Sequence, residues 1–189
     1  MKNFLQLATV DVLPLLLAIK RRPELWKEDT YLRDYPQGPF GDTETIMLRF
    51  PVKTTVETQK ELEEYGKSDG QHENVDQPAY AKLTEARPIV FGLMSRVQGE
   101  RLGRVMINSL RPGGTIFPHA DTPAHCEYYT RFHCVLQTSP GAVIRCGDET
   151  IHMPQGTVWW FNNALEHEVL NGGTVDRIHM VIDIRTSLR

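Results

Sequence analysis

The sequence predicts an α+β protein, mainly β, in which a double-stranded β-helix (a cupin-like jelly roll) is backed by N-terminal helices. Helical patterns lie in residues 1–103, and from residue 104 onward short β-rich runs alternate with turn residues. That order is typical of a sheet covered on one face by helices. A chain of 189 residues, 40% of them hydrophobic, is long enough for one well-filled core. We therefore expect a single domain over 1–189, with a covering region at 1–103 and a β-helix core at 104–186.

The covering region should open with a helix. Thr9 or Asp11 can cap it, and its first turn tolerates Pro14. Pro23 ends or restarts this helix. A strand is expected over 45–50, where apolar and polar residues alternate.

The rest of the covering region is polar before it becomes helical again. A surface helix is expected over 57–65 and a mobile segment over 66–76, in which His72 would be a solvated bystander. A second covering helix should start at Pro88 and stop near Gly99.

Seven β-rich runs are expected in the second half, at 104–110, 127–138, 142–146, 150–153, 157–161, 168–170 and 176–184. Side chains alternate across a strand, so Arg131 and His133 share one face. On the last run Arg177, His179 and Asp183 share a face, and the opposite face is entirely apolar. Because that apolar face should meet the helices, Arg177 should point into the barrel.

Composition excludes several classes of partner. The net charge is -3 without a basic run, which gives no footprint for nucleic acid or for an anionic membrane. The chain has three cysteines, an odd number, and no two of them form a C-x-x-C motif. We therefore expect reduced thiols at Cys126, Cys134 and Cys146. The apolar run 12–19 is too short to span a bilayer and no small-residue cleavage site follows it, so a cytoplasmic location is expected. Small molecules or peptides are the expected partners.

Four residues form a candidate metal and oxoacid site. His119 and Asp121 lie two positions apart, His167 follows far along the chain, and Arg177 comes ten residues later. Two imidazoles and a carboxylate can occupy one face of Fe(II) and leave the other positions open. A chelating oxoacid and then O2 would bind there, with Arg177 holding the far carboxylate of the oxoacid. We interpret this pattern as an oxygenase.

Alternatives remain open at this point. His125 could compete as a ligand, whereas His152 and His179 are expected to be packed strand residues. Arg131 could be a surface cation, although its shared face with His133 favours a functional role. One alternative function is a cupin-like metalloenzyme that uses the same histidines without an oxoacid. The other is a non-catalytic β barrel that binds a small ligand.

Ordered blocks of sequence carry a resemblance to a known family. They are Pro112-Gly113-Gly114-Thr115 through Pro118-His119, Arg131-Phe132-His133, residues 144–150, and residues 161–169. Over roughly 108–184 the chain resembles the aspartyl/asparaginyl β-hydroxylase family of Fe(II)- and 2-oxoglutarate-dependent oxygenases. The resemblance implies hydroxylation of an unactivated C–H bond of a small amino acid, a peptide or a protein side chain, with conversion of 2-oxoglutarate and O2 to succinate and CO2.

The resemblance also implies roles for single residues. His119 and His167 match the family's iron-binding histidines. At Asp121 the animal members have Gly, so the carboxylate makes a full His-Asp-His triad more probable in this chain.

The remaining implied roles concern the organic ligands. Arg177 matches the arginine that binds the distal carboxylate of 2-oxoglutarate, and His133 matches a histidine that contacts the oxoacid near the metal. Asn108 stands where the family can use Ser for the distal carboxylate. Arg131 matches an arginine placed toward the substrate, which favours a substrate that carries a carboxylate.

Overall fold

The structure, a computed structural model, describes residues 1–34, 38–51, 61, 64 and 72–187. Its helices are α1 (Leu13–Lys20), the 3-10 helix η1 (Pro23–Lys27), α2 (Tyr31–Asp34), α4 (Pro78–Lys82), α5 (Ala86–Arg96) and α6 (Pro123–Tyr128). Its strands are β1 (Phe4–Thr9), β2 (Thr43–Phe50), β3 (Val75–Asp76), β4 (Gly99–Leu110), β5 (Thr115–His119), β6 (Thr130–Gln137), β7 (Ala142–Cys146), β8 (Glu149–Ile151), β9 (Thr157–Phe161), β10 (His167–Asn171) and β11 (Arg177–Thr186).

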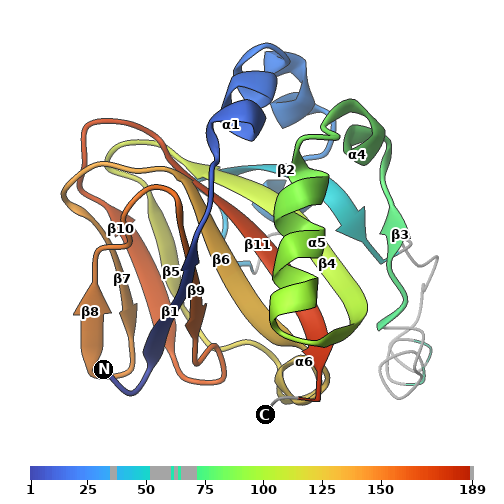
Figure 1. Cartoon of the computed structure of the whole chain (residues 1–189). Coiled ribbons are helices and arrows are strands. Elements are labelled where there is room, and N and C mark those ends of the chain that lie inside the picture. The colour runs from blue at the N-terminus through green and yellow to red at the C-terminus, as the bar shows by residue number, and fades with distance from the viewer. Residues whose placement is uncertain (35–37, 52–60, 62–63, 65–71, 188–189) are drawn as a thin grey trace.

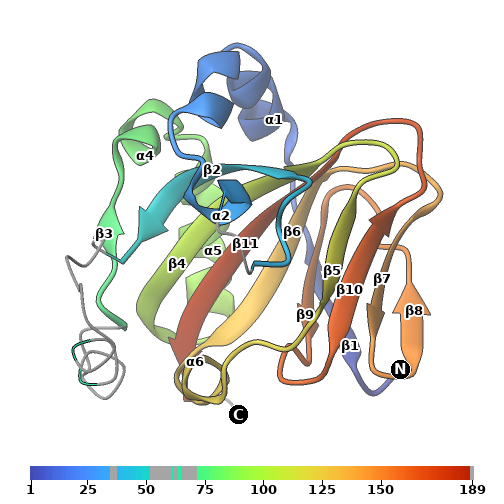
Figure 2. The ribbon, with the colours of Figure 1, turned by 180° about the vertical axis from the view of Figure 1, so that it is seen from behind.

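Two antiparallel sheets form the body of the protein. Among the described residues, one sheet has seven strands in the order β1-β9-β6-β11-β4-β2-β3, and the other has four in the order β5-β10-β7-β8. The smaller sheet lies against one part of the larger one (Figure 1, Figure 2). From β6 to β11 the chain passes back and forth between them: β6, β9 and β11 belong to the larger sheet, and β7, β8 and β10 to the smaller one. This arrangement confirms the predicted double-stranded β-helix.

Helices cover the outer face of the larger sheet, and α5 lies across β4 in Figure 1. The inward-outward alternation of β11 explains this cover, because one face of the strand is wholly apolar. That face joins a buried cluster with α1 and α5, made of Leu15, Leu16, Ile19, Ile89, Val90, Leu93, Ile178, Met180, Ile182 and Ile184. Each such side chain contributes about 1.5–3 kcal/mol when buried. The prediction that Arg177 points into the barrel is therefore confirmed.

A second apolar cluster lies between the two sheets. It contains Phe4, Leu110, Ile116, Val135, Ile144, Cys146, Met153, Trp159, Phe161 and Val169. These residues fill one part of the barrel, and the polar residues described below occupy the rest of its interior.

Among the described residues, no helix is long and apolar enough to cross a membrane.

The N-terminal half differs from the prediction in several places. Strand β4 begins at Gly99, inside the predicted covering region 1–103, and α5 begins at Ala86 rather than at Pro88. Residues 4–9 form β1, which pairs antiparallel with β9 at one edge of the larger sheet. The covering region therefore supplies an edge strand that the sequence pattern did not indicate, since only Phe4 of this strand is fully buried. The prediction of a mobile segment over 66–76 is wrong at its C-terminal end. There β3 pairs with β2, and His72 is buried. Apart from residues 61 and 64, the predicted helix 57–65 lies outside the described residues.

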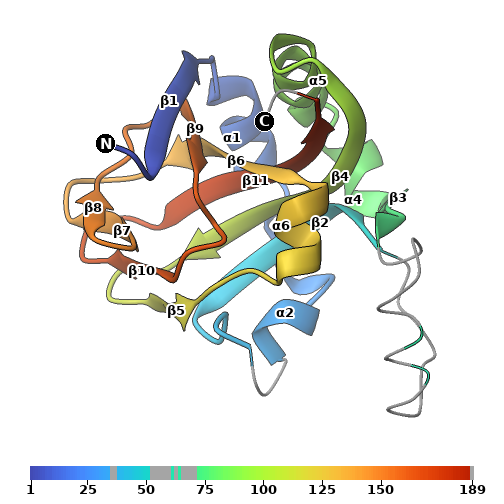
Figure 3. The ribbon, with the colours of Figure 1, turned by 90° about the horizontal axis from the view of Figure 1, so that it is seen from below.

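The strand predicted over 127–138 is shorter than expected. Its first residues belong to α6, which Pro123 opens in the first helical turn. The aromatic pair Tyr128-Tyr129 extends the apolar pattern and hides this boundary. Figure 3 shows β5 leading into α6, so a helix follows directly after the segment that carries His119 and Asp121.

Candidate metal centre

His119, Asp121 and His167 come together as the sequence predicted. His119 ends β5 and His167 begins β10, and the two residues are register partners in the smaller sheet. Their ring centroids lie 4.3 Å apart. Asp121 follows the end of β5, and its backbone N–H donates to the Asn163 carbonyl oxygen at 3.1 Å. One ligand atom from each of the three residues lies within 4.8 Å of the others.

Both imidazoles are oriented by the backbone. Nδ1 of His119 lies 2.7 Å from the Phe117 carbonyl oxygen, and Nδ1 of His167 lies 2.9 Å from the Leu165 carbonyl oxygen. A carbonyl only accepts, so each Nδ1 carries the proton and each Nε2 keeps its lone pair. Outer hydrogen bonds of this kind are typical of metal-binding histidines. Burial also lowers the pKa of His167, which favours the neutral imidazole that a metal requires.

The Asp121 carboxylate is held by one of its oxygens. Oδ2 accepts 2.6 Å hydrogen bonds from Arg131 Nη1 and from Asn163 Nδ2. Burial raises the pKa of Asp121, but the charge of Arg131 and the Asn163 hydrogen bond outweigh it, so the pKa lies below its ordinary value. The carboxylate is thus ionised, and these two donors leave Oδ1 for a cation. The donor set of two imidazole nitrogens and one carboxylate oxygen fits Fe(II).

A second polar group lies farther along the barrel, around Arg177. The guanidinium is 4% exposed and its Nη2 donates to Nδ1 of His179 at 3.1 Å. Burial lowers the pKa of Arg177 to about 9, which leaves the group charged at neutral pH. In the described part of the chain, no carboxylate forms an ion pair with it. A buried cation without a counterion is costly, and an anionic ligand would offset that cost.

His133 and Asn108 lie beside this cation. Burial, reinforced by the charge of Arg177, lowers the pKa of His133 well below its ordinary value, so the ring is neutral. Neither of its ring nitrogens has a hydrogen-bond partner among the described residues. Asn108 pairs with His179 across β4 and β11, and its Oδ1 accepts from the Thr45 hydroxyl at 3.0 Å. Its amide nitrogen is therefore available to a ligand.

One pocket connects these two groups. The cavity volume is about 110 Å³, which is room for far more than one ordered water. Its lining combines the three candidate metal ligands with apolar residues and further basic side chains. These are Leu32, Phe40, Phe50, Arg104, Met106, Asn108, Ile116, His119, Asp121, Arg131, His133, Ile144, Phe161, His167, Val169, Arg177, His179 and Val181.

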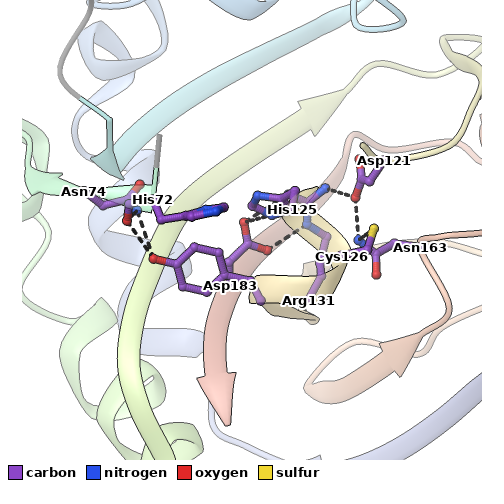
Figure 4. Close-up of polar contacts among 9 residues, drawn as sticks. His72, Asn74, Asp121, His125, Cys126, Arg131, Asn163 and Asp183 are labelled. Carbon is purple, nitrogen blue, oxygen red and sulfur yellow. Dashed lines mark hydrogen bonds and ion pairs between the residues drawn. The ribbon is translucent and has the colours of Figure 1, made fainter. Parts of the chain in front are cut away.

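Arg131 lies at the edge of this pocket and is fully engaged with protein groups. Its Nε and Nη2 donate to the two oxygens of Asp183, at 2.8 and 3.0 Å, and its Nη1 donates to Asp121 (Figure 4). Nε2 of His125 donates to Asp183 at 2.9 Å. All three guanidinium nitrogens thus have acceptors. The substrate role predicted for Arg131 stays a prediction.

The other histidines of the sequence have structural surroundings. His125 contacts Asp183 and does not belong to the group of possible metal ligands. His152 uses Nδ1 to contact the Ala142 carbonyl oxygen at 2.8 Å. His72 was predicted to be a solvated bystander, and this is wrong, because its ring stacks on that of Tyr128 with centroids 3.9 Å apart.

Three residues of the site were missed at the sequence level. Asn163 and Asp183 hold Asp121 and Arg131, and Arg104 lines the pocket. Arg104 shares the inward face of β4 with Asn108, so alternation along that strand would have found it. Asp183 was placed on the inward face of β11, but its partner could not be named without the register between strands.

Comparisons with known proteins found a matching family model and several relatives. The model of the family described as aspartyl/asparaginyl beta-hydroxylase matches residues 58–187, which is more than half of the chain. An L-proline cis-4-hydroxylase of Rhizobium meliloti (strain 1021) is 31% identical over 93 residues, which are 49% of this chain and 31% of that protein. The mouse aspartyl/asparaginyl beta-hydroxylase is 29% identical over 90 residues, 48% of this chain and 12% of that protein. This chain thus spans less than a third of each of these relatives.

Solved structures share the fold over nearly the whole chain. A viral collagen prolyl hydroxylase from Paramecium bursaria Chlorella virus-1 aligns with a TM-score of 0.53 at 11% identity, covering 97% of this chain and 96% of that one. A Pseudomonas putida prolyl-4-hydroxylase aligns with a TM-score of 0.51 at 14% identity, covering 97% and 92%. At these identities the likeness is one of fold.

Proposed function

This chain belongs to the aspartyl/asparaginyl β-hydroxylase family, and on that premise we propose that it hydroxylates an unactivated C–H bond of an amino acid, a peptide or a protein side chain. The cofactors that go with this family are Fe(II), 2-oxoglutarate and O2. Once bound, they supply the oxidising chemistry, in which the oxoacid is converted to succinate and CO2 as the substrate is hydroxylated. The observation that carries the proposal is the His119–Asp121–His167 group beside the uncompensated cation Arg177.

The metal would be held by Nε2 of His119, Nε2 of His167 and Oδ1 of Asp121. The contacts of both Nδ1 atoms and of Asp121 Oδ2 support this choice, because they leave those three atoms without a hydrogen-bond partner in the described part of the chain. Three protein ligands on one face leave room for a chelating oxoacid. The protein's contribution is to orient the metal and to keep water from the reacting atoms.

The oxoacid would lie between the metal centre and Arg177. Arg177 would bind the distal carboxylate through two parallel N–H···O bonds, the geometry that suits a planar guanidinium. Asn108 would donate to the same carboxylate from its amide nitrogen. The neutral ring of His133, which has no hydrogen-bond partner among the described residues, would donate to the oxoacid near the metal.

The substrate would carry a carboxylate, and Arg104 supports this. Its guanidinium stacks over the Phe50 ring at 5.2 Å, lines the pocket, and forms no ion pair among the described residues. Arg104 and Asn108 are four positions apart on β4, roughly 13 Å of strand, so one oxoacid bound near Asn108 does not reach Arg104. Arg104 would therefore bind a second anion, that of the substrate.

The experiment that tests the proposal starts from apoprotein mixed anaerobically with Fe(II) and 2-oxoglutarate. We expect a visible metal-to-ligand charge-transfer band, its loss in His167→Ala, and a need for far more oxoacid in Arg177→Ala. Metal binding without any band would contradict the oxoacid and favour a cupin-like metalloenzyme. Absence of metal binding would leave a ligand-binding β barrel.

A second experiment identifies the substrate class. Free amino acids, including L-proline and L-aspartate, and peptides that contain these residues are incubated with the Fe(II) enzyme, and succinate is measured. Each hit is compared with its amide. We expect carboxylates to stimulate turnover and their amides to do so far less.

A further inference from the structure

We propose that Asp183 is a positioning residue for the metal centre. Acting through Arg131, it holds the Asp121 carboxylate so that one oxygen faces the metal. The inference rests on the proposed metal site, and it concerns Asp183, which is not among the residues that line the pocket and which contacts Arg131 and His125 (Figure 4).

The core of the inference is a buried bidentate ion pair. Asp183 is 0% exposed and Arg131 is 8% exposed, and the two are register partners on the adjacent strands β11 and β6. Both oxygens of Asp183 accept from Arg131, at 2.8 and 3.0 Å. Burial raises the pKa of Asp183, but the charge of Arg131 and the His125 hydrogen bond outweigh it, so the carboxyl stays ionised. A buried pair with this geometry fixes the guanidinium plane.

The fixed guanidinium then reaches a less constrained part of the chain. Asp121 lies between the end of β5 and the start of α6, where no strand ladder holds the backbone. Arg131 donates from Nη1 to Asp121 Oδ2 at 2.6 Å, and Asn163 donates to the same oxygen. Arg131 of β6, held by Asp183 of β11, thus helps to set the orientation of the Asp121 carboxylate.

The Asp183 carboxylate also anchors the far end of the segment 121–125, which joins β5 to α6. His125, in α6, donates to Asp183 Oδ2 at 2.9 Å. The Arg131–Asp183 pair therefore contacts the segment at two points, Asp121 at one end and His125 at the other. A segment held at both ends loses less conformational entropy when Asp121 binds a cation, and the affinity for the metal rises accordingly.

The buried position of the Arg131–Asp183 pair would also fit a role in stability alone. Measuring metal affinity distinguishes that role from the positioning of Asp121. Partners behind metal ligands typically contribute 10- to 100-fold in affinity. Asp183→Asn should therefore weaken metal binding by roughly 10- to 100-fold. If Asp183 acts through Asp121, the same substitution should have little further effect once Asp121→Asn has removed the carboxylate.

The measurement is the dissociation constant of Ni(II) by calorimetry, without oxoacid or O2. Ni(II) binds such sites more tightly than Fe(II), so weakened variants remain measurable. The set comprises wild type, Asp183→Asn, Asp121→Asn and the double variant. Leu93→Ala is the control, because it removes a core contact of α5 at 5% exposure and leaves the polar groups of the barrel intact. Urea unfolding of every variant accompanies the titrations.

The proposal predicts a large effect of Asp183→Asn, wild-type affinity in Leu93→Ala, and non-additivity with Asp121→Asn. Unchanged affinity in Asp183→Asn, or an equal loss in the Asp121→Asn background, would overturn it. If Asp183→Asn does not fold, His125→Leu keeps the ion pair and removes the donor that anchors the segment to Asp183. It should weaken Ni(II) binding several-fold, and wild-type affinity there would count against the proposal. Wild type that fails to bind Ni(II) would instead refute the metal centre and the proposed function with it.

Discussion

Replacing Arg177 with Met should stabilise the apoprotein. Burial lowers the pKa of Arg177 from 12.5 to about 9, which corresponds to a cost of order 5 kcal/mol for the charged form as an upper bound. At pH 7 this cost is present in full, because the pH lies below both the folded and the unfolded pKa. The substitution also removes the hydrogen bond to His179, worth about 1 kcal/mol. We therefore expect a gain of about 1–3 kcal/mol in the free energy of unfolding.

The stability advantage of Arg177→Met should shrink by about 2.3 kcal/mol when 2-oxoglutarate is present. Breaking a buried ion pair costs about 3 kcal/mol or more, so the oxoacid should dissociate roughly 100-fold more readily from Arg177→Met. At an oxoacid concentration 100 times the wild-type dissociation constant, ligand binding stabilises wild type by about 2.7 kcal/mol. The variant should gain only about 0.4 kcal/mol at the same concentration.

The assay is chemical unfolding at pH 7 of the apoprotein, and of the Ni(II)-loaded protein with and without 2-oxoglutarate. Arg145→Met is the matched control, since Arg145 is a partly exposed arginine paired with Glu166 and Glu168. It should leave the oxoacid effect intact. An Arg177→Met apoprotein less stable than wild type, or equal protection of both by the oxoacid, would refute the assignment of Arg177 as an uncompensated cation awaiting an anion.

Three further predictions follow from the surrounding structure. Arg104→Gln should raise the KM of the carboxylate-bearing substrate by roughly 10- to 100-fold, the worth of one charged hydrogen bond, and steady-state kinetics should show an unchanged KM for 2-oxoglutarate. Burial lowers the pKa of His133 and His179 well below their ordinary values, so the unfolded chain binds more protons below pH 6.5. Urea unfolding of the apoprotein should therefore show a loss of up to about 2.7 kcal/mol per pH unit as the pH falls from 6 to 5, and a flat profile would contradict it. Gly141→Ala should lower the Tm by several degrees, because φ is +97° and a Cβ would lie 2.6 Å from a carbonyl oxygen, whereas Gly92→Ala in α5 meets nothing within 4 Å and should raise the Tm slightly.

The amino-acid sequence by itself determined the fold class and the identity of the central groups. Strand periodicity and turn residues are local signals, so β7 and β9 were predicted with their observed bounds. Alternation along β11 was enough to turn Arg177 toward the interior. The spacing of His119, Asp121 and His167 was distinctive enough to indicate a metal site before any distance was known.

Only the tertiary structure decided which groups hold those residues in place. The pairing of Asp183 with Arg131 depends on the register between β11 and β6, and Asn163 reaches Asp121 across 42 residues of chain. Edge strand β1 likewise became visible only through its pairing with β9, because a strand buried at one residue carries almost no periodic signal. Local patterns report what a segment buries, whereas contacts between distant segments follow from strand register and sheet packing, which no single segment encodes.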